Sequence, residues 1–301
     1  MGFIEVNDVV KRYSGHTALD HVSLSVPQGS IYGLLGPNGA GKTSLIRIIN
    51  QITDPDEGTV SIGGRPMRRD DVARIGYLPE ERGLYKKMNV GDEIVYLARL
   101  KGMSKGDAIM AMLDWLKRFD LSEWRDKKVE ALSKGMQQKV QFIATVIHRP
   151  ELLIFDEPFS GFDPVNADQL KAEILRLRDQ GSTILFSTHN MESVEAICEE
   201  ISLINHSKVV LQGRVDDIRH GHKKNVIAVS VDRGGRVEAD PSLFTVLPAE
   251  AGRRDTLVRL NAGVTVREAI ACLNERYTLT GFTEVLPSMH EIFVETVKQE
   301  V

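Results

Sequence analysis

The sequence predicts an α/β fold with a mainly parallel sheet, joined by an antiparallel β part, an α-helical insertion and a small C-terminal α+β domain. Two observations support this prediction. The apolar runs IYGLL at 31–35 and LLIFD at 152–156 have the continuous hydrophobic character of buried strands in a parallel sheet. Segments with helical periodicity follow both runs, so that strands and helices alternate along the chain.

The remaining elements of the first part of the chain follow from the period of the apolar residues. VSLSV at 22–26 alternates like a half-buried strand, and the first 35 residues have the character of β-structure. Further strands are expected at TVSIGG (59–64) and TILFS (183–187). Apolar residues recur at helical spacing in five segments: 44–52, 90–103, 105–119, 134–148 and about 164–180.

The composition changes near residue 213, which marks a second domain. GRVDDIRHGHKKN at 213–225 is polar and predicts a linker with a short helix. The rest of the chain has two strand patterns, a helix, and a strand that a Pro separates from a last helix: 226–231, 256–260, 265–277 and 281–297. We therefore expect a large first domain over 1–220, with its helical insertion at about 85–130, and an accessory domain over 221–301.

Bulk properties exclude several classes of protein. The 301 residues carry a net charge of −4, which gives no reason to expect nucleic-acid binding. The N-terminus has no apolar signal-peptide core, and no run of about 18 apolar residues is present, so that a membrane role requires a partner. Cys198 and Cys272 belong to no Cys/His cluster, which favours reduced thiols of a cytosolic protein.

GPNGAGKT at 36–43 fits the phosphate-loop pattern G-x-x-x-x-G-K-S/T between a strand and a helix. Its glycines allow backbone N–H groups to point at phosphate, beside the N-terminus of the following helix. Lys42 is expected to reach the β- and γ-phosphates, Thr43 to bind Mg²⁺, and Ser44 to add a contact to the α-phosphate. The expected nucleotide-binding residues of this loop are Gly36, Pro37, Asn38, Gly39, Ala40, Gly41, Lys42, Thr43 and Ser44.

Two adjacent carboxylates end the apolar strand LLIFD. Asp156 is placed to hold Mg²⁺ through water, and Glu157 to act as the general base on the attacking water. Two carboxylates at a strand end are costly to bury without a cation, which argues against a packing role. Together with the phosphate loop they predict an ATPase.

LSKGMQQK at 132–139 adds a second place for phosphate. Ser133 is a plausible N-cap of the helix at 134–148, and a Ser-x-Gly turn that opens a helix suits phosphate binding. Because they carry these motifs in this order, residues 3–220 resemble the nucleotide-binding subunit of an ATP-binding-cassette (ABC) transporter. The family's signature is usually L-S-G-G-Q; here Lys134 replaces the first Gly and Met136 replaces the Gln.

The resemblance implies roles for five positions. Ser133 and Gly135 would contact the γ-phosphate that a second subunit binds. Asp163 of SGFD (160–163) resembles the D-loop residue that couples the two sites, and His189 of STH (187–189) resembles the switch histidine. Tyr13 resembles the aromatic that stacks on adenine. The implied cofactors are ATP and Mg²⁺.

One position departs from the family in a way that bears on the metal. The family has Gln after Y-L-P, whereas IGYLPEERGLY at 75–85 has Glu80. A carboxylate can bind Mg²⁺ but donates no hydrogen bond unless protonated. Glu80 is therefore either a metal ligand or a member of the loop that links the site to the transmembrane partner. This phrase, the signature and the ending PSMHEIFVETV (287–297) resemble the ABC-2-type exporter branch, which includes sodium-extruding and drug-resistance systems.

The function implied is an ATPase subunit that closes as a homodimer, or with a paired ABC subunit, on two ATP and powers export through a separate transmembrane permease. It would be cytoplasmic and peripheral on the inner face of the cell membrane, with the helical insertion passing the motion on. Soluble ABC ATPases of DNA repair or translation are an alternative, but the expected long coiled coil or second cassette is missing. A P-loop kinase or GTPase, and a regulatory subunit that binds ATP without turnover, are further alternatives.

Overall fold

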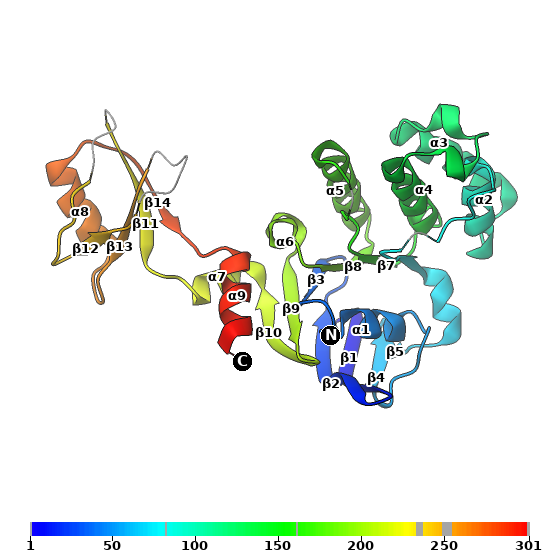
Figure 1. Ribbon diagram of the computed structural model, residues 1–301, viewed down its shortest axis with the longest axis horizontal. Helices are drawn as coiled ribbons and strands as arrows, with labels where there is room; N and C mark the ends of the chain where they lie inside the picture. Colours follow the sequence, from blue (N-terminus) through cyan, green and yellow to red (C-terminus); the bar gives the residue numbers. More distant parts are fainter. Residues whose placement is uncertain (1, 82, 161, 233–236, 249–254, 300–301) are drawn as a thin grey trace. The chain divides into compact units, whose positions relative to one another are not determined.

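The computed structural model describes residues 2–81, 83–160, 162–232, 237–248 and 255–299 (Figure 1). Arg82 of the IGYLPEERGLY phrase and Gly161 of the expected D-loop lie outside these residues, as do three short parts of the expected C-terminal domain. The chain separates into two compact units, residues 1–215 and 216–301. The boundary expected near residue 220 falls within the short helix α7 (Val215–Gly221). In the described part of the chain, no helix has the length and apolar character that a membrane span requires.

The first unit contains a mainly parallel sheet, which confirms the predicted fold class. Over the described residues it has six strands in the order β10-β9-β3-β8-β7-β6, and only the β10–β9 pair is antiparallel. The strands are β3 (Ile31–Leu35), β6 (Ile75–Leu78), β7 (Leu152–Asp156), β8 (Thr183–Thr188), β9 (Glu200–Asn205) and β10 (Lys208–Arg214). β3 and β7 are buried along their whole length, as their continuous apolar character predicts.

A four-stranded antiparallel sheet forms the expected β part, in the order β2-β1-β4-β5 over the described residues. Its strands are β1 (Ile4–Tyr13), β2 (His16–Val26), β4 (Glu57–Ile62) and β5 (Arg65–Pro66). Helix α1 (Lys42–Ile49) buries four apolar side chains, and one hydrophobic core joins them to residues of both sheets. Burial of each such side chain stabilises the fold by about 1.5–3 kcal/mol. The core therefore fixes the helix that follows the phosphate loop against both sheets.

The helical insertion lies beside α4 and away from the antiparallel sheet (Figure 1). It contains α2 (Val90–Leu100) and α3 (Lys105–Arg118), and α4 (Lys134–Val146) follows. Trp115 of α3, Phe119, and Phe142 of α4 have ring centroids about 6 Å apart, and these aromatic rings join the insertion to α4. The 3-10 turns are η1 (Arg69–Arg74), η2 (Ser122–Trp124) and η3 (Val129–Ala131), and two further helices are α5 (Pro164–Asp179) and α6 (Met191–Ile197).

The second unit is a small α+β fold. Its antiparallel sheet has the order β12-β13-β11-β14 over the described residues. Its elements are β11 (Val226–Val231), β12 (Phe244–Val246), β13 (Thr256–Leu260), α8 (Val266–Arg276), β14 (Leu279–Val285) and α9 (Met289–Gln299). β13 and β14 pair antiparallel with β11 on its two sides, so that they run parallel to each other. Helix α8 connects these two strands. Ala269 and Leu273 of α8 pack on Ile227, Val229 and Val258 of the sheet.

The predicted linker at 213–225 is wrong at its start. Gly213 and Arg214 are the last residues of β10, where they pair with β9. Their polar sequence resembles a linker because β10 is an edge strand with no fully buried side chain, and alternation is weak in such a strand. The short helix expected in this segment is present as α7.

Candidate functional site

The phosphate loop connects the buried end of β3 to the N-terminus of α1, and two of its glycines have no possible substitute. Gly36 has φ 149°, and a Cβ there would lie 2.2 Å from the carbonyl oxygen of Ile204. Gly41 has φ 116°, and its Cβ would lie 2.3 Å from the carbonyl oxygen of Ala18. Backbone of two neighbouring strands thus closes on the loop, and only glycine allows that approach.

Lys42 is buried, and its ammonium lies inside the loop. Its Nζ donates to the carbonyl oxygens of Gly36 at 2.7 Å and Pro37 at 3.1 Å. These carbonyls hold the ammonium in the place of phosphate oxygens. Burial lowers the pKa of Lys42, and the nearby carboxylates of Glu157 and Asp156 partly offset this by raising it. The lysine is therefore held between the loop and the carboxylates at the end of β7.

Glu157 is fixed by three hydrogen-bond donors from the end of β8. Its Oε1 accepts from the backbone N–H of His189 at 2.9 Å and lies 2.7 Å from His189 Nδ1, while its Oε2 accepts from Thr188 Oγ1 at 3.1 Å. The register Asp156↔Ser187 between β7 and β8 brings these residues together. Glu157 also has φ 50°, a conformation that costs a non-glycine residue about 1–3 kcal/mol. Such strain is concentrated at functional sites.

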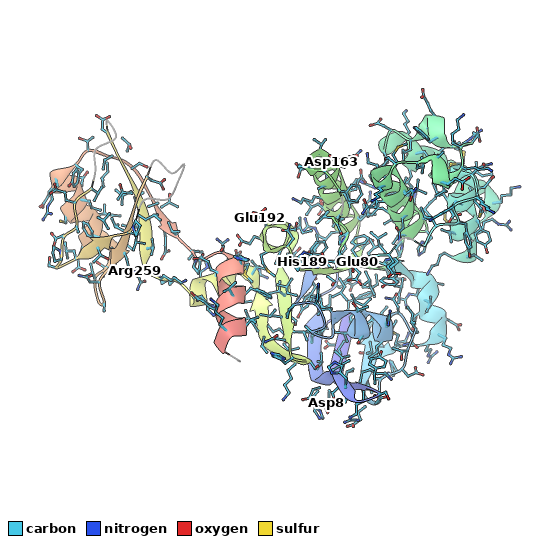
Figure 2. All side chains as sticks on the ribbon, in the orientation of Figure 1. Asp8, Glu80, Asp163, His189, Glu192 and Arg259 are labelled. Carbon is cyan, nitrogen blue, oxygen red and sulfur yellow. The ribbon has the colours of Figure 1, made fainter. Side chains whose placement is uncertain are left out.

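Most of the predicted site residues meet at one open cavity of about 430 Å³. Figure 2 labels Glu80 and His189, which come from loops after β6 and β8 and lie together at this cavity. The predicted residues that line it are Tyr13, Asn38, Gly39, Ala40, Gly41, Lys42, Thr43, Ser44, Glu80, Asp156, Glu157 and His189. Gly36 and Pro37 do not line it, because their carbonyls face Lys42 instead.

The donor set of this cavity fits a magnesium ion that nucleotide and water also ligate. Asp156 is buried, and its pKa is raised by burial and by the charges of Glu157 and Glu80, while a hydrogen bond with Ser187 and the charge of Lys42 lower it in part. Among the described residues, no three His, Cys, Asp or Glu side chains converge as a metal site. Mg²⁺ usually takes one or two carboxylates or hydroxyls and completes its shell with phosphate and water. The hydroxyl of Thr43 and the carboxylate of Asp156 suit that arrangement.

Two residues of the cavity were not predicted, His16 and Ala18. Both belong to β2, directly after the turn that follows Tyr13. A lone exposed histidine carries no motif, and an alanine in an alternating strand resembles any packing residue. The signal that could have found His16 is the two-residue turn at Ser14 and Gly15, which pairs it with Tyr13.

Besides Gly36 and Pro37, three predicted residues lie outside the cavity. Ser133 caps α4, accepting a hydrogen bond from Met136 N–H at 3.3 Å. A Cβ on Gly135 would meet no atom within 4 Å, so that the start of α4 is open to an approaching group. Asp163 caps α5, accepting from Asn166 N–H at 3.1 Å, and this hydrogen bond lowers its pKa. The phosphate loop with its cavity and the exposed start of α4 thus lie at separate places in the structure.

Comparison with known proteins identifies families of ATP-binding proteins. Residues 19–160 match the family model described as ABC transporter, and residues 213–297 match the C-terminal domain of DrrA1-3-like ATP-binding proteins. The chain is 42% identical to the ABC transporter ATP-binding protein YhaQ of Bacillus subtilis, over 98% of each protein.

Two further relatives agree. The daunorubicin/doxorubicin resistance ATP-binding protein DrrA of Streptomyces peucetius is 30% identical over 87% of this chain and 80% of its own length. A solved ATP-binding subunit of an ABC transporter matches with TM-score 0.68 and 29% identity, over 73% of this chain and 92% of that one. The phosphate loop, the paired carboxylates and these likenesses agree that the chain belongs to the ATP-binding subunits of ABC transporters, which bind and hydrolyse ATP.

Proposed function

We propose that this chain hydrolyses ATP with Glu157 as the general base and His189 as the residue that orients the phosphate and water. The observation that supports this most is the Glu157–His189 pair itself, which lines one cavity with the phosphate loop. A base must be positioned before it is effective, and three donors fix this carboxylate at the end of β7.

The proposed step begins with ATP in the phosphate loop. Lys42 leaves the loop carbonyls and binds the β- and γ-phosphates, which are stronger acceptors. Glu157 takes a proton from the attacking water. With Nδ1–H of His189 donating to Glu157, a doubly protonated imidazole would donate its Nε2–H to the γ-phosphate. Bound Mg²⁺ would neutralise phosphate charge. Thr43 and Asp156 would hold it, and Glu80, which is exposed at the cavity, would be a further ligand.

A second subunit completes each site in this proposal. Ser133 and Gly135 lie outside the chain's own cavity, at the exposed start of a helix whose N-terminus favours an anion. They would therefore contact the γ-phosphate that the partner binds, and Asp163, on the neighbouring loop, would couple the two sites. Contacts that exist only with the γ-phosphate provide the difference in affinity that closes and reopens the pair.

The partner proposed for transport is a separate transmembrane permease, with this chain on the inner face of the cell membrane. An apolar groove of about 250 Å³ between the β6 loop, α2 and α4 suits a helix of such a partner. Tyr85, Tyr96 and Leu100, in this part of the chain, are large apolar side chains that are more than 40% exposed, and Leu100 lines the groove. Pro79 and Leu84 line the groove while Glu80 lines the nucleotide cavity, so that one loop touches both. Export is proposed because relatives are named for drug resistance.

Replacing Glu157→Gln tests the mechanism. The variant keeps the shape of the side chain but removes the base, so that ATP hydrolysis should fall at least about 100-fold while ATP binding persists. ATP should then hold the variant as a dimer, which light scattering would detect. Glu192→Gln is the matched control, because Glu192 is an exposed carboxylate in the first turn of α6 that does not line the cavity (Figure 2). Unchanged hydrolysis in E157Q would exclude the assigned base, and a wild-type chain without hydrolysis would indicate a regulatory subunit.

A further inference from the structure

The hairpin between β1 and β2 brings two aromatic rings to the nucleotide cavity. A two-residue turn, Ser14 and Gly15, connects the strands, and Gly15 has φ 78°, a conformation that glycine adopts at no steric cost. Tyr13 and His16 are consequently direct partners across the hairpin. Side chains of directly opposite residues project on the same face of a sheet. Both rings line the cavity of the phosphate loop.

One face of Tyr13 is already occupied. The Nζ of Lys11 lies 5.6 Å from the centroid of the Tyr13 ring, in a cation–π position. Lys11 is itself held by Asp56 Oδ1 at 3.0 Å and by the carbonyl oxygen of Asp54 at 2.8 Å, and its side chain is only 12% exposed. Tyr13 remains 43% exposed and lines the cavity, so that much of its surface is still accessible to a ligand. The tyrosine is therefore preset for a ligand that stacks on its other side.

The same strand continues from His16 to the phosphate loop. Ala18 lines the cavity, and its carbonyl oxygen lies against Gly41 at the N-terminus of α1. A nucleotide whose phosphates occupy the loop thus has β2 beside it, and the nucleoside would extend toward the turn that carries Tyr13 and His16. A bicyclic purine with its sugar is larger than one tyrosine ring and reaches a second ring next to it.

We propose that His16 is a second nucleoside-contacting residue, whose imidazole ring stacks against the nucleoside beside Tyr13, with Lys11 as the positioning residue behind the tyrosine. The site would recognise a purine nucleoside by stacking of its flat base on aromatic rings. This inference rests on the proposed binding of ATP by the phosphate loop but requires no particular catalytic base.

The test compares two ligands that differ in the nucleoside. MgADP and magnesium tripolyphosphate are titrated calorimetrically into the full-length chain, and both fill the phosphate loop. His16→Asn removes the ring and keeps polarity, and His16→Phe keeps a ring without its nitrogens. His21→Asn is the matched control, since His21 lies on the same strand outside the cavity, and its φ of 54° suits asparagine.

H16N should bind MgADP about fivefold more weakly, the low end of what a stacked base contributes, and tripolyphosphate as tightly as the wild type. H16F should recover MgADP affinity to within about twofold, and H21N should change neither affinity. Equal MgADP affinity in H16N, a loss of tripolyphosphate binding alongside it, or failure of H16F to recover would each overturn the inference.

ATP hydrolysis by the wild-type chain is measured in parallel, and it tests the proposed function separately. A chain that hydrolyses ATP with an affinity insensitive to His16 would exclude this inference alone. A chain whose MgADP affinity depends on His16 but which hydrolyses no ATP would exclude the proposed catalysis alone.

Discussion

Asp156 shows how a site residue works against the stability of the fold that carries it. Burial and the charges of Glu157 and Glu80 raise its pKa, so that the folded chain binds this proton more tightly than the unfolded chain does. Stability contributed by the protonated form is present at low pH and is lost as pH rises from the ordinary carboxyl range through the raised pKa. At neutral pH, the nucleotide-free protein therefore carries an unfavourable charge at the end of β7.

Replacing Asp156→Asn should stabilise the nucleotide-free chain while it removes ATP hydrolysis. The expected gain is about 1 kcal/mol, or roughly 2–4 °C in Tm, because the amide keeps the shape without the charge. Urea unfolding at several pH values should show that the difference in stability between D156N and the wild type disappears toward low pH. Asp168→Asn removes a charge from a side chain that is 79% exposed on α5 and should leave Tm unchanged. A less stable D156N would show that Lys42 offsets the repulsion.

Side-chain N-caps mark the starts of several helices of the first unit, including the two that begin at Ser133 and Asp163. Ser104, Ser133, Asp163 and Asn190 each accept a hydrogen bond from the N–H three residues on, at the starts of α3, α4, α5 and α6. A cap of this kind contributes about 1 kcal/mol. Only Ser133 was predicted as a cap; Asp163 is also one, and its proposed coupling role is additional to that contact. A cap therefore identifies the start of a helix, and its surroundings decide whether it binds anything else.

The pair Ser133→Ala and Ser104→Ala separates these two roles. Both variants lose one cap, so that each should lower the unfolding free energy by about 1 kcal/mol. ATP hydrolysis should fall about 10-fold or more in S133A, which also loses the proposed contact to γ-phosphate, and should stay near wild type in S104A. Thermal unfolding and steady-state ATPase assays measure both effects. Equal activity in the two variants would restrict Ser133 to its capping role.

At the scale of the whole molecule, the proposed site is shared between two copies of the chain. Each copy would contribute Glu157 to one site and Ser133 to the other. Variants that break different halves should therefore complement each other, since a mixed dimer of E157Q and S133A contains one site with both residues intact. A single chain that carried both elements in its own cavity would not behave in this way.

Mixing E157Q with S133A before ATP is added should give hydrolysis well above the average of the separate preparations. At equal amounts, random pairing places about half of the chains in mixed dimers, each with one intact site, so that the mixture should approach about a quarter of wild-type activity if one site suffices. The control mixes S133A with wild type at the same total concentration. A mixture that shows only the average of its components would argue against shared sites.

The sequence by itself determined the fold class, the phosphate loop, the paired carboxylates and the family, because each depends on short-range patterns of apolar period and motif spacing. It determined less where the pattern is weak: β10 is an exposed edge strand, and its end at Gly213 and Arg214 has the composition of a linker. The register of β7 with β8, which places His189 on Glu157, required the folded sheet.

Only the tertiary structure decided which residues share a cavity. His16 has no motif and gains its place from a turn and a cross-strand pair. Burial lowers the pKa of Lys42 and raises that of Asp156, and the attraction between the two opposite charges partly offsets both shifts. Ser133 caps α4 in its own chain but lies outside the cavity that holds the other site residues. Spacing along a chain encodes local geometry, whereas burial and proximity are properties of the packed fold.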